Sequence, residues 1–253
     1  MKIGLQGASG RTGSKVIEVI GEFPGLSIGA ALIEPGSEFI GAPCADTGVT
    51  YSSDFESALQ NCDAFIDFST VDSSLALAAG VAKLQKPLLI ATTGHSEKAI
   101  EQLKEHAKTA PILLASNTSL GVFALHRLIE NAQEILGPDF RMEISEIHHE
   151  HKVDAPSGTA KTLAAALNKD NKYKIVTDRS SIHQARDQFE IGVSSIRGGD
   201  VAGEHTVYFI GKGERIEVAH KATDRSIFAR GALRLIQRLH TKPNGFYTPT
   251  NLY

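Results

Sequence analysis

The segment from Glu146 to Ala160 holds the densest group of reactive side chains in the chain, with three histidines, a lysine and three acids. His148 is the candidate proton donor, because an imidazole both donates and accepts protons near neutral pH. His149 and Lys152 bring positive charge to the same segment. These residue types predict proton transfer to a bound anion.

A helix start follows this group directly. Ser157, which comes after Pro156, is a good N-cap for a helix predicted over Gly158–Leu167. The amides of Gly158 and Thr159 would then be free at the positive end of the helix, where carboxylates and phosphates bind. The predicted ligands of an anionic substrate are His149, Lys152, Ser157, Gly158 and Thr159.

The histidines also allow two other interpretations. His148, His149 and His151 could bind zinc, but no H-E-x-x-H helix or cysteine pair accompanies them. Neighbouring residues of a strand point to opposite faces, so these histidines would need a further ligand. A structural capped loop with solvated histidines is the other alternative. We expect no metal site.

A glycine-rich turn, Gly7-Ala8-Ser9-Gly10-Arg11-Thr12-Gly13, lies between a predicted strand, Lys2–Gln6, and a predicted helix, Thr12–Glu22. Glycines allow a tight turn, and the helix N-terminus then offers amides to a pyrophosphate. Ser9 replaces the middle glycine of the commonest dinucleotide fingerprint. We predict a dinucleotide site over Gly7–Thr12, with a purely structural turn as the alternative.

An acid follows the second predicted strand. Glu34 lies 21 residues after Gly13, where an acid binds the ribose hydroxyls in many dinucleotide sites. A solvated acid in a Glu34-Pro35-Gly36 turn is the alternative. Arg11 and Lys15 could reach an adenosine 2′-phosphate, so NADH and NADPH both remain possible.

Short polar segments follow the other predicted strands of this region. Ligands of doubly wound sheets bind at the carboxyl ends of the strands, so these segments are expected to line the site. Turn formation alone would also place Thr, Ser and Gly there. The candidate cofactor contacts are Ala91, Thr92, Thr93, Ala115, Ser116, Asn117 and Thr118, and Asp67-Phe68-Ser69-Thr70 follows the third strand.

The pattern of predicted strands and helices changes near residue 120. Before this point, short apolar runs alternate with helical patterns, which is typical of a Rossmann-like, doubly wound parallel sheet in an α/β fold. A helix is predicted over Ser96–Thr109 with Ser96 as its N-cap. The predicted strands are Lys2–Gln6, Leu26–Ile33, Ala64–Phe68, Pro87–Ala91 and Ile112–Ala115.

Strands predominate after a strongly periodic helix, Leu120–Leu136, that Gly137-Pro138 ends. The predicted strands are Met142–Ile147, Phe189–Ile196, Thr206–Ile210 and Arg215–Ala219, the last two joined as a hairpin. This pattern predicts a C-terminal α+β domain, 120–224, with a mixed, largely antiparallel sheet. A last amphipathic helix, Ser226–His240, is expected to return to the first domain, which would then comprise 1–119 completed by 225–253.

Composition excludes several classes of protein. The 253 residues suit one large or two modest domains, and 42% hydrophobic with 22% charged residues is ordinary globular usage. A net charge of −3 without charge blocks argues against nucleic-acid and membrane partners. Cys44 and Cys62 have no partner motif. No apolar run approaches the roughly 18 residues of a membrane span or forms a signal peptide, so we expect a cytoplasmic protein.

The motifs described above resemble those of the dihydrodipicolinate reductase family, whose members are also called 4-hydroxy-tetrahydrodipicolinate reductases. The resemblance covers nearly the whole chain. The most specific match runs from His148-His149 through Lys152 to Asp154-Ala155-Pro156-Ser157-Gly158-Thr159-Ala160. Further matches are the glycine turn, Asp67-Phe68-Ser69, Ala91-Thr92-Thr93-Gly94, Asn117-x-Ser119-x-Gly121, Arg197-Gly198-Gly199, Gly203-Glu204-His205 and the closing Lys242-Pro243-Asn244-Gly245-Phe246-Tyr247.

The resemblance implies a reductase of the diaminopimelate route to lysine, which reduces a cyclic dicarboxylate to tetrahydrodipicolinate with NADH or NADPH. It implies that residues 120–224 bind the substrate and assemble homotetramers through their sheet. His148 would be the proton donor and Lys152 a second acid or a charge stabiliser. His149, Gly158 and Thr159 would hold the substrate carboxylates.

For the cofactor, the resemblance implies that Gly7–Thr12 cradle the pyrophosphate, while Ala91–Thr93 and Ala115–Thr118 position the nicotinamide. One departure concerns Ile33-Glu34, which stand where many relatives carry an acid followed by arginine. We therefore expect use of both NADH and NADPH, with a lean to NADH. A catalytically silent dinucleotide-binding sensor of the same fold is the alternative function, and a metal-dependent hydrolase is a third.

Overall fold

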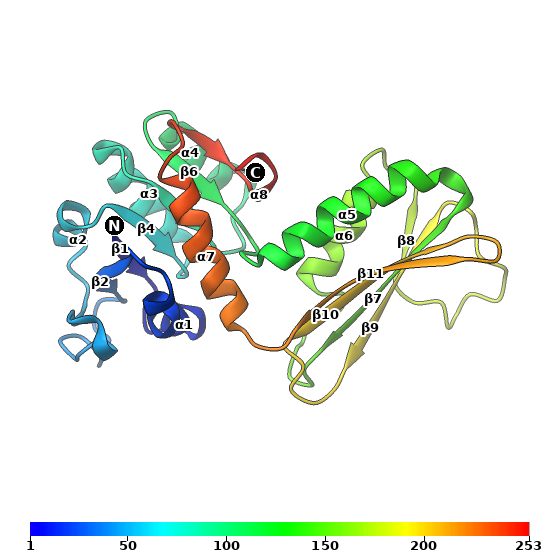
Figure 1. Cartoon of the computed structure of the whole chain (residues 1–253), viewed down its shortest axis with the longest axis horizontal. Helices are drawn as coiled ribbons and strands as arrows, with labels where there is room; N and C mark the ends of the chain where they lie inside the picture. The colour runs from blue at the N-terminus through cyan, green and yellow to red at the C-terminus, as the bar shows by residue number, and fades with distance from the viewer. Residues whose placement is uncertain (253) are drawn as a thin grey trace. The chain divides into compact units, whose positions relative to one another are not determined.

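The structure is a computed structural model that describes residues 1–252. It contains two compact units, one formed by Met1–Ser119 with the residues from Arg225 onward and the other by Leu120–Asp224 (Figure 1). No helix in residues 1–252 is long and apolar enough to cross a membrane.

Unit 1 is built on a parallel sheet in which the strands lie in the order β12-β6-β5-β4-β1-β2-β3. Its strands are β1 (Lys2–Gln6), β2 (Ser27–Leu32), β3 (Tyr51–Ser52), β4 (Ala64–Asp67), β5 (Leu88–Ile90), β6 (Pro111–Leu114) and β12 (Gly245–Tyr247). The order from β3 to β6 is that of the Rossmann fold, in which the chain changes direction between β1 and β4. The predicted doubly wound parallel sheet is confirmed.

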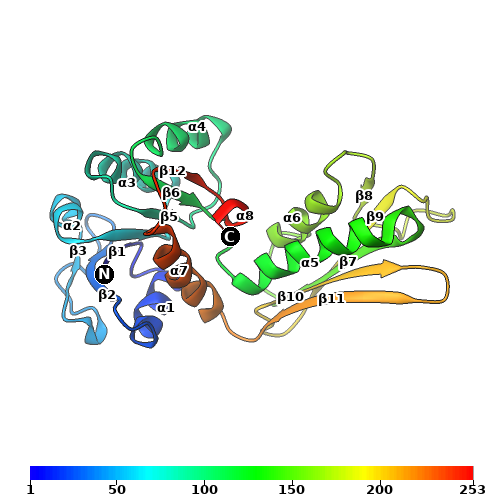
Figure 2. The same ribbon diagram turned by 45° about the horizontal axis from the view of Figure 1, so that its top comes forward.

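Helices cover both faces of this sheet (Figure 2). They are α1 (Arg11–Val19), α2 (Phe55–Asn61), α3 (Val71–Leu84), α4 (Glu97–His106), α7 (Ser226–Leu239) and the short α8 (Pro249–Leu252). Buried apolar residues of α2, α3 and α4 pack with Phe65, Leu88 and Ile112 of the sheet. On the other face, α7 packs against α1 and against the central strands. The last long helix thus belongs to unit 1.

Unit 2 has a five-stranded sheet in the order β11-β10-β7-β9-β8. Its strands are β7 (Arg141–His148), β8 (Lys174–Val176), β9 (Glu190–Arg197), β10 (Gly203–Ile210) and β11 (Arg215–Ala222). The sheet is mixed, as predicted: β10 runs antiparallel to β7 and β11, whereas β9 runs parallel to β7 and β8. The predicted hairpin is β10–β11, and each strand in it is longer than expected.

Two helices, α5 (Leu120–Leu136) and α6 (Gly158–Leu167), cover one face of the mixed sheet, and both have the predicted bounds. Alternate residues of β7 face these helices, so Met142 and Ile144 join the apolar core. The next two residues of the same row are Glu146 and His148, which are also buried. The apolar row of β7 therefore continues into a buried polar pair.

Candidate active site

The glycine turn after β1 requires glycine for steric reasons. Gly7 has a φ of +75°, and a Cβ there would lie 2.3 Å from the Phe68 carbonyl oxygen. A Cβ on Gly13 would lie 2.1 Å from the Gly7 carbonyl oxygen. The amides of Gly7 and Ala8 both donate to the Leu32 carbonyl at the end of β2, at 3.0 and 3.1 Å. These contacts hold the turn against β2 and the loop after β4.

The start of α1 fits a dinucleotide pyrophosphate. Gly10 is its N-cap, no described side chain caps the helix, and its first turn holds no acid. Ser9, Gly10 and Arg11 are exposed, so their backbone is accessible to a ligand. An uncapped N-terminus with accessible amides is the arrangement that binds phosphate groups. The turn also lies beside β1 and β4, where ligands of such sheets bind.

Replacing Gly13 with alanine should weaken NADH binding, because the added Cβ would displace the Gly7 carbonyl and open the turn. Loss of one charge-assisted hydrogen bond, worth roughly 1.5–3 kcal/mol, raises the Kd by about 10- to 100-fold. NADH fluorescence titration measures this directly. Gly21→Ala is the matched control, since its Cβ meets nothing within 4 Å. An unchanged Kd in folded Gly13→Ala would contradict the proposed cradle.

A buried carboxylate joins the loops after β4 and β5. Asp67 accepts hydrogen bonds from the hydroxyls of Ser74 at 2.5 Å and Thr92 at 2.7 Å, and from the Ser69 hydroxyl and amide. Burial raises the pKa of Asp67, and these donors oppose that shift. The Thr92 hydroxyl also accepts from the Ser69 amide at 2.9 Å. The Thr92 side chain is thus committed to the protein, while its neighbour Thr93 is exposed.

The loop after β6 is anchored in a similar way. The Thr118 hydroxyl donates to the Phe228 carbonyl at 2.7 Å, and a Cβ on Gly231 would lie only 1.8 Å from the Thr118 carbonyl oxygen. The Asn117 side chain accepts from the Ser119 amide at 2.9 Å. Thr118 therefore supports α7 with its side chain, and Ser116 is the exposed residue of this predicted cofactor segment.

Glu34 lies two residues beyond the end of β2 and is exposed. Its carbonyl accepts from the Ser37 amide at 3.3 Å, so it does open a turn, as one interpretation of the sequence expects. Its carboxylate is accessible, as a ribose ligand must be. Lys15 is paired with Glu18 at 2.7 Å, which leaves Arg11 as the more available cation.

In unit 2, His148 is 9% exposed and belongs to a hydrogen-bonded network. Its Nδ1 lies 2.5 Å from Oε2 of Glu146, a carboxylate with no exposed surface. The guanidinium of Arg197 donates to both oxygens of Glu146, at 2.9 and 2.8 Å. Burial alone would raise the pKa of Glu146, but hydrogen bonds from Arg197, Ser195 and His148 outweigh it and bring the pKa to about 2.

A second histidine lies against the first. The ring of His205 is 5.1 Å from that of His148, edge to face. Burial, aided by the nearby charge of His148, lowers the pKa of His205 to about 4, so this ring is neutral at physiological pH. Burial also lowers the pKa of His148, although Glu146 counteracts this. His148 is therefore a stronger acid in its protonated form than a free imidazole.

The start of α6 joins this network through Ser157. The Ser157 hydroxyl accepts from the Ala160 amide at 3.1 Å, which confirms it as the N-cap. Its oxygen lies 3.0 Å from Nε2 of His205, and its amide donates to Glu146 at 3.2 Å. The Ser157 side chain is buried in these contacts, whereas Gly158 is exposed at the N-terminus of the helix.

Lys152 and His149 belong to the loop between β7 and α6. Lys152 Nζ donates to Asp154 at 2.7 Å, its side chain is 21% exposed, and its charge lowers the pKa of His148. The His149 amide donates to the Val201 carbonyl at 2.8 Å. The His151 side chain is 83% exposed, and its ring centroid lies 6.3 Å from that of His149. No group of three side chains that could hold a metal gathers within residues 1–252.

Glu146, Arg197 and His205 are the site residues that sequence reasoning gave no role. Glu146 is two residues before His148 on a strand, and this spacing places both on one face. That signal was available in the sequence. Arg197 and His205 reach Glu146 and His148 only because of the register of the neighbouring strands. On β7, Glu146 pairs with Ser195 of β9 on one side and with His205 of β10 on the other.

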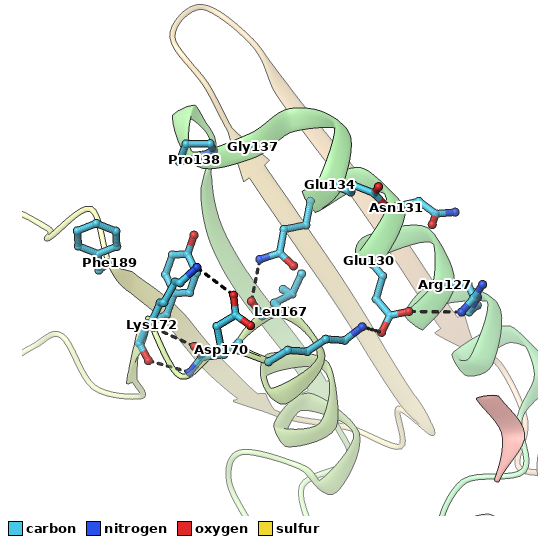
Figure 3. Close-up of a pocket in the computed structure, with 14 residues that line it drawn as sticks. Arg127, Glu130, Asn131, Glu134, Gly137, Pro138, Leu167, Asp170, Lys172 and Phe189 are labelled. Carbon is cyan, nitrogen blue, oxygen red and sulfur yellow. Dashed lines mark hydrogen bonds and ion pairs between the residues drawn. The ribbon is translucent and has the colours of Figure 1, made fainter. Parts of the chain in front are cut away.

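A separate groove of about 730 Å³ lies in unit 2 beside the C-terminal halves of α5 and α6 (Figure 3). Its charged side chains are largely paired with one another, Lys169 with Glu130 at 2.8 Å and Lys172 with Asp170 at 3.0 Å. None of the sequence-predicted site residues lines it. The histidine network and this groove are therefore distinct features of unit 2.

A Rossmann-type unit with an accessible glycine turn, joined in one chain to a second unit with a buried histidine–carboxylate pair, is typical of nicotinamide-dinucleotide-dependent oxidoreductases. Residues 1–118 match the model of the dihydrodipicolinate reductase N-terminus and residues 121–252 that of the dihydrodipicolinate reductase C-terminus. The chain belongs to the dihydrodipicolinate reductase family, in agreement with the resemblance in its sequence.

Curated relatives match over nearly their full length. The chain is 40% identical to the 4-hydroxy-tetrahydrodipicolinate reductase of Syntrophotalea carbinolica, covering 98% of this chain and 96% of that protein. It is 41% identical to the reductase of the same name from Cupriavidus necator, covering 98% and 97%. The dipicolinate-bound dihydrodipicolinate reductase from a Paenisporosarcina species has the same fold, with a TM-score of 0.81, 19% identity and coverage of 98% and 97%.

Proposed function

We propose that this protein is a 4-hydroxy-tetrahydrodipicolinate reductase, which forms tetrahydrodipicolinate with NADH or NADPH in the diaminopimelate route to lysine. Its family membership and its similarity to named reductases support this activity. The observation that carries the mechanism is the His148–Glu146 pair beside the N-terminus of α6. A silent sensor would need neither a buried histidine–carboxylate pair nor a lysine next to it.

The substrate is a cyclic imine with two carboxylates, and unit 2 offers it a helix N-terminus, a lysine and a histidine. The exposed amide of Gly158 and that of Thr159 lie at the positive end of α6. Lys152 is the charged partner, and His149 lies in the same loop. We assign these residues to the substrate carboxylates, while Ser157 shapes the site from within.

The cofactor supplies the hydride when it is bound to unit 1. Reduction of a ring conjugated with an imine makes carbon and nitrogen electron-rich, so an acid must deliver a proton. We assign that proton to Nε2 of His148, because Nδ1 is bonded to Glu146. Lys152 stabilises the negative charge of the substrate or provides a second acid.

In unit 1 we assign the pyrophosphate to Gly7–Thr12. The other cofactor contacts follow from exposure and backbone position. We assign the nicotinamide to the loops Ala91–Thr93 and Ala115–Thr118. The hydroxyls of Thr92 and Thr118 already bond to other protein groups, so these two residues would contact the cofactor through their backbone. Glu34 is assigned to the adenosine ribose. This exposed carboxylate would repel a 2′-phosphate, which favours NADH, while exposed Arg11 would attract one.

A coupled assay tests the function and the cofactor together. Pyruvate and aspartate semialdehyde are condensed by a separate synthase, and oxidation of NADH and of NADPH is followed after this protein is added. We expect oxidation that requires both the protein and the synthase, with both cofactors active and NADH somewhat preferred. A large preference for NADPH would contradict the assignment of Glu34. No oxidation by protein that binds a dinucleotide would favour the sensor.

We further propose that the protein is a cytoplasmic homotetramer assembled through the mixed sheet of unit 2. No helix within residues 120–224 covers the face opposite α5 and α6, and Ile196 and Ile210 on it are 51% and 39% exposed. Light scattering should give four times the 27.1 kDa of one chain. Ile196→Asp should then lower the assembly mass, and a monomeric wild type would contradict this proposal.

A further inference from the structure

Glu146 is the most deeply buried charged group of unit 2. Its two oxygens take hydrogen bonds from the two terminal nitrogens of Arg197 and from the Ser157 amide, besides the contact with His148. A carboxylate that receives this many donors is ionised, and an ionised carboxylate only accepts hydrogen bonds. Arg197 cannot give up its charge, so this state persists over the whole physiological range.

The ionised Glu146 determines which nitrogen of His148 carries a hydrogen. Oε2 lies 2.5 Å from Nδ1, and since Oε2 cannot donate, the hydrogen must be on Nδ1. The neutral ring then has an unprotonated Nε2, and Nε2 gains or loses the proton when His148 titrates. A carboxylate that binds the inner nitrogen of a histidine commonly fixes its tautomer and orientation in this way.

The surroundings of Nε2 leave it space. Gly203, the first residue of β10, lies next to it, and a Cβ on Gly203 would lie 3.0 Å from Nε2, in contact with the ring edge. The other groups facing His148 are Arg197, Lys152 and His205. Glu146 pairs with both Arg197 and His148, so its single charge balances only one of them, while Lys152 pairs with Asp154 and His205 is uncharged. The hydrogen bond and the charge of Glu146 favour an imidazolium at position 148, whereas the charges of Lys152 and Arg197 oppose it.

We propose that Glu146, held by Arg197, is a positioning residue that keeps the hydrogen of His148 on Nδ1 and presents Nε2 to the substrate. This inference rests on the proposed function, in which Nε2 of His148 delivers the proton. Glu146 itself does not touch the substrate. Its effect on the reaction passes through the tautomer and the orientation of His148.

Glu146→Gln separates this role from simple stabilisation. The amide oxygen would take the place of Oε1, where it accepts from one terminal nitrogen of Arg197 and from the Ser157 amide. The amide NH₂ would then take the place of Oε2, face Nδ1 and move the ring hydrogen to Nε2. We expect kcat to fall by roughly 10- to 100-fold, the usual effect of removing the partner of a functional histidine, with a smaller change in KM. Solid-state ¹⁵N NMR of histidine-labelled protein at about pH 8, where the ring is neutral, should show the hydrogen on Nδ1 in wild type and on Nε2 in the variant.

Glu143→Gln is the matched control. Glu143 lies on the same strand and also pairs with an arginine, Arg186 at 2.7 Å, but it occupies the opposite face of the sheet. Its replacement should leave the His148 tautomer unchanged. Glu146→Asp retains the carboxylate and should keep more activity than Glu146→Gln if charge and hydrogen bonding are what matter.

The wild-type spectrum alone can overturn the proposal. A neutral His148 with its hydrogen on Nε2 would contradict it, whether or not any variant folds. Equal losses of kcat in Glu146→Gln and Glu143→Gln, with the tautomer unchanged, would make Glu146 a structural residue. Failure of the proposed function is a different result, because wild type would then oxidise neither cofactor in the coupled assay while its tautomer remained measurable.

Discussion

His148→Gln should lower kcat by roughly 10²- to 10⁴-fold and change the KM for the substrate much less, which is the usual effect of losing a positioned acid. Glutamine can still donate to Glu146 and roughly fills the site of the ring, so binding groups stay in place. It has no proton to deliver at neutral pH. Steady-state kinetics in the coupled assay measure both constants, and near-normal turnover would remove His148 from the reaction.

The pH dependence gives a second check on His148. Burial lowers its pKa below the ordinary value of about 6.5, so the protonated form is lost in the free protein as pH rises through that lower value. We expect kcat/KM to fall there. A bound dicarboxylate favours the imidazolium, so kcat should fall at a higher pH than kcat/KM does. In His148→Gln this limb should disappear from both profiles, and its persistence would assign it to another group.

Local signals in the sequence predicted the elements that carry their own boundaries. Leu120–Leu136 has a continuous apolar stripe and ends at Gly137-Pro138, and Gly158–Leu167 begins at a capping serine. Both helices have the predicted bounds. Ser96 likewise caps α4, which ends at His106 and not at Thr109. Caps and stops act within a few residues, so the sequence alone displays them.

Elements without such a signal were missed. Val71–Leu84 is rich in small apolar residues all round, so it has no clear polar face to reveal a helix. It is stabilised by burial, and Gly80 lets it approach Leu59 and Phe55 of α2. The edge strands β3, β8 and β12 have only two or three residues and depend on their neighbours in the sheet.

The same distinction applies to the candidate site. The histidines, Lys152 and Ser157 stand together in the sequence, and so composition and capping predicted them. Arg197 is 51 residues from Glu146, and their contact requires the parallel pairing of β7 with β9. A position at the end of a strand does not by itself assign a role in binding, because Thr92 and Thr118 use their hydroxyls to hold loops and a helix. Exposure and hydrogen bonding separate such roles only once the chain is folded.

Lys152→Ala should lower kcat/KM by about 30- to 4,000-fold, since truncating one partner of a charge pair that is partly removed from water costs about 2–5 kcal/mol. The Lys152 side chain is only 21% exposed and lies near enough to His148 to affect its pKa. If it contacts a substrate carboxylate and the developing charge, KM should rise and kcat should fall together. The salt dependence of kcat/KM should also weaken, because one attractive charge is gone.

Two further variants make this prediction specific to the charge of Lys152. Lys152→Arg keeps the charge and should retain more activity than Lys152→Ala. Asp154→Asn removes the acid that Lys152 now binds at 2.7 Å, and it should leave the KM unchanged or lower it, because the ammonium no longer has to exchange one carboxylate for another. Titration with dipicolinate, which the Paenisporosarcina relative binds, would report the affinity without turnover. A loss confined to thermal stability would make Lys152 the structural partner of Asp154 and leave the α6 N-terminus with His149 as the anion site.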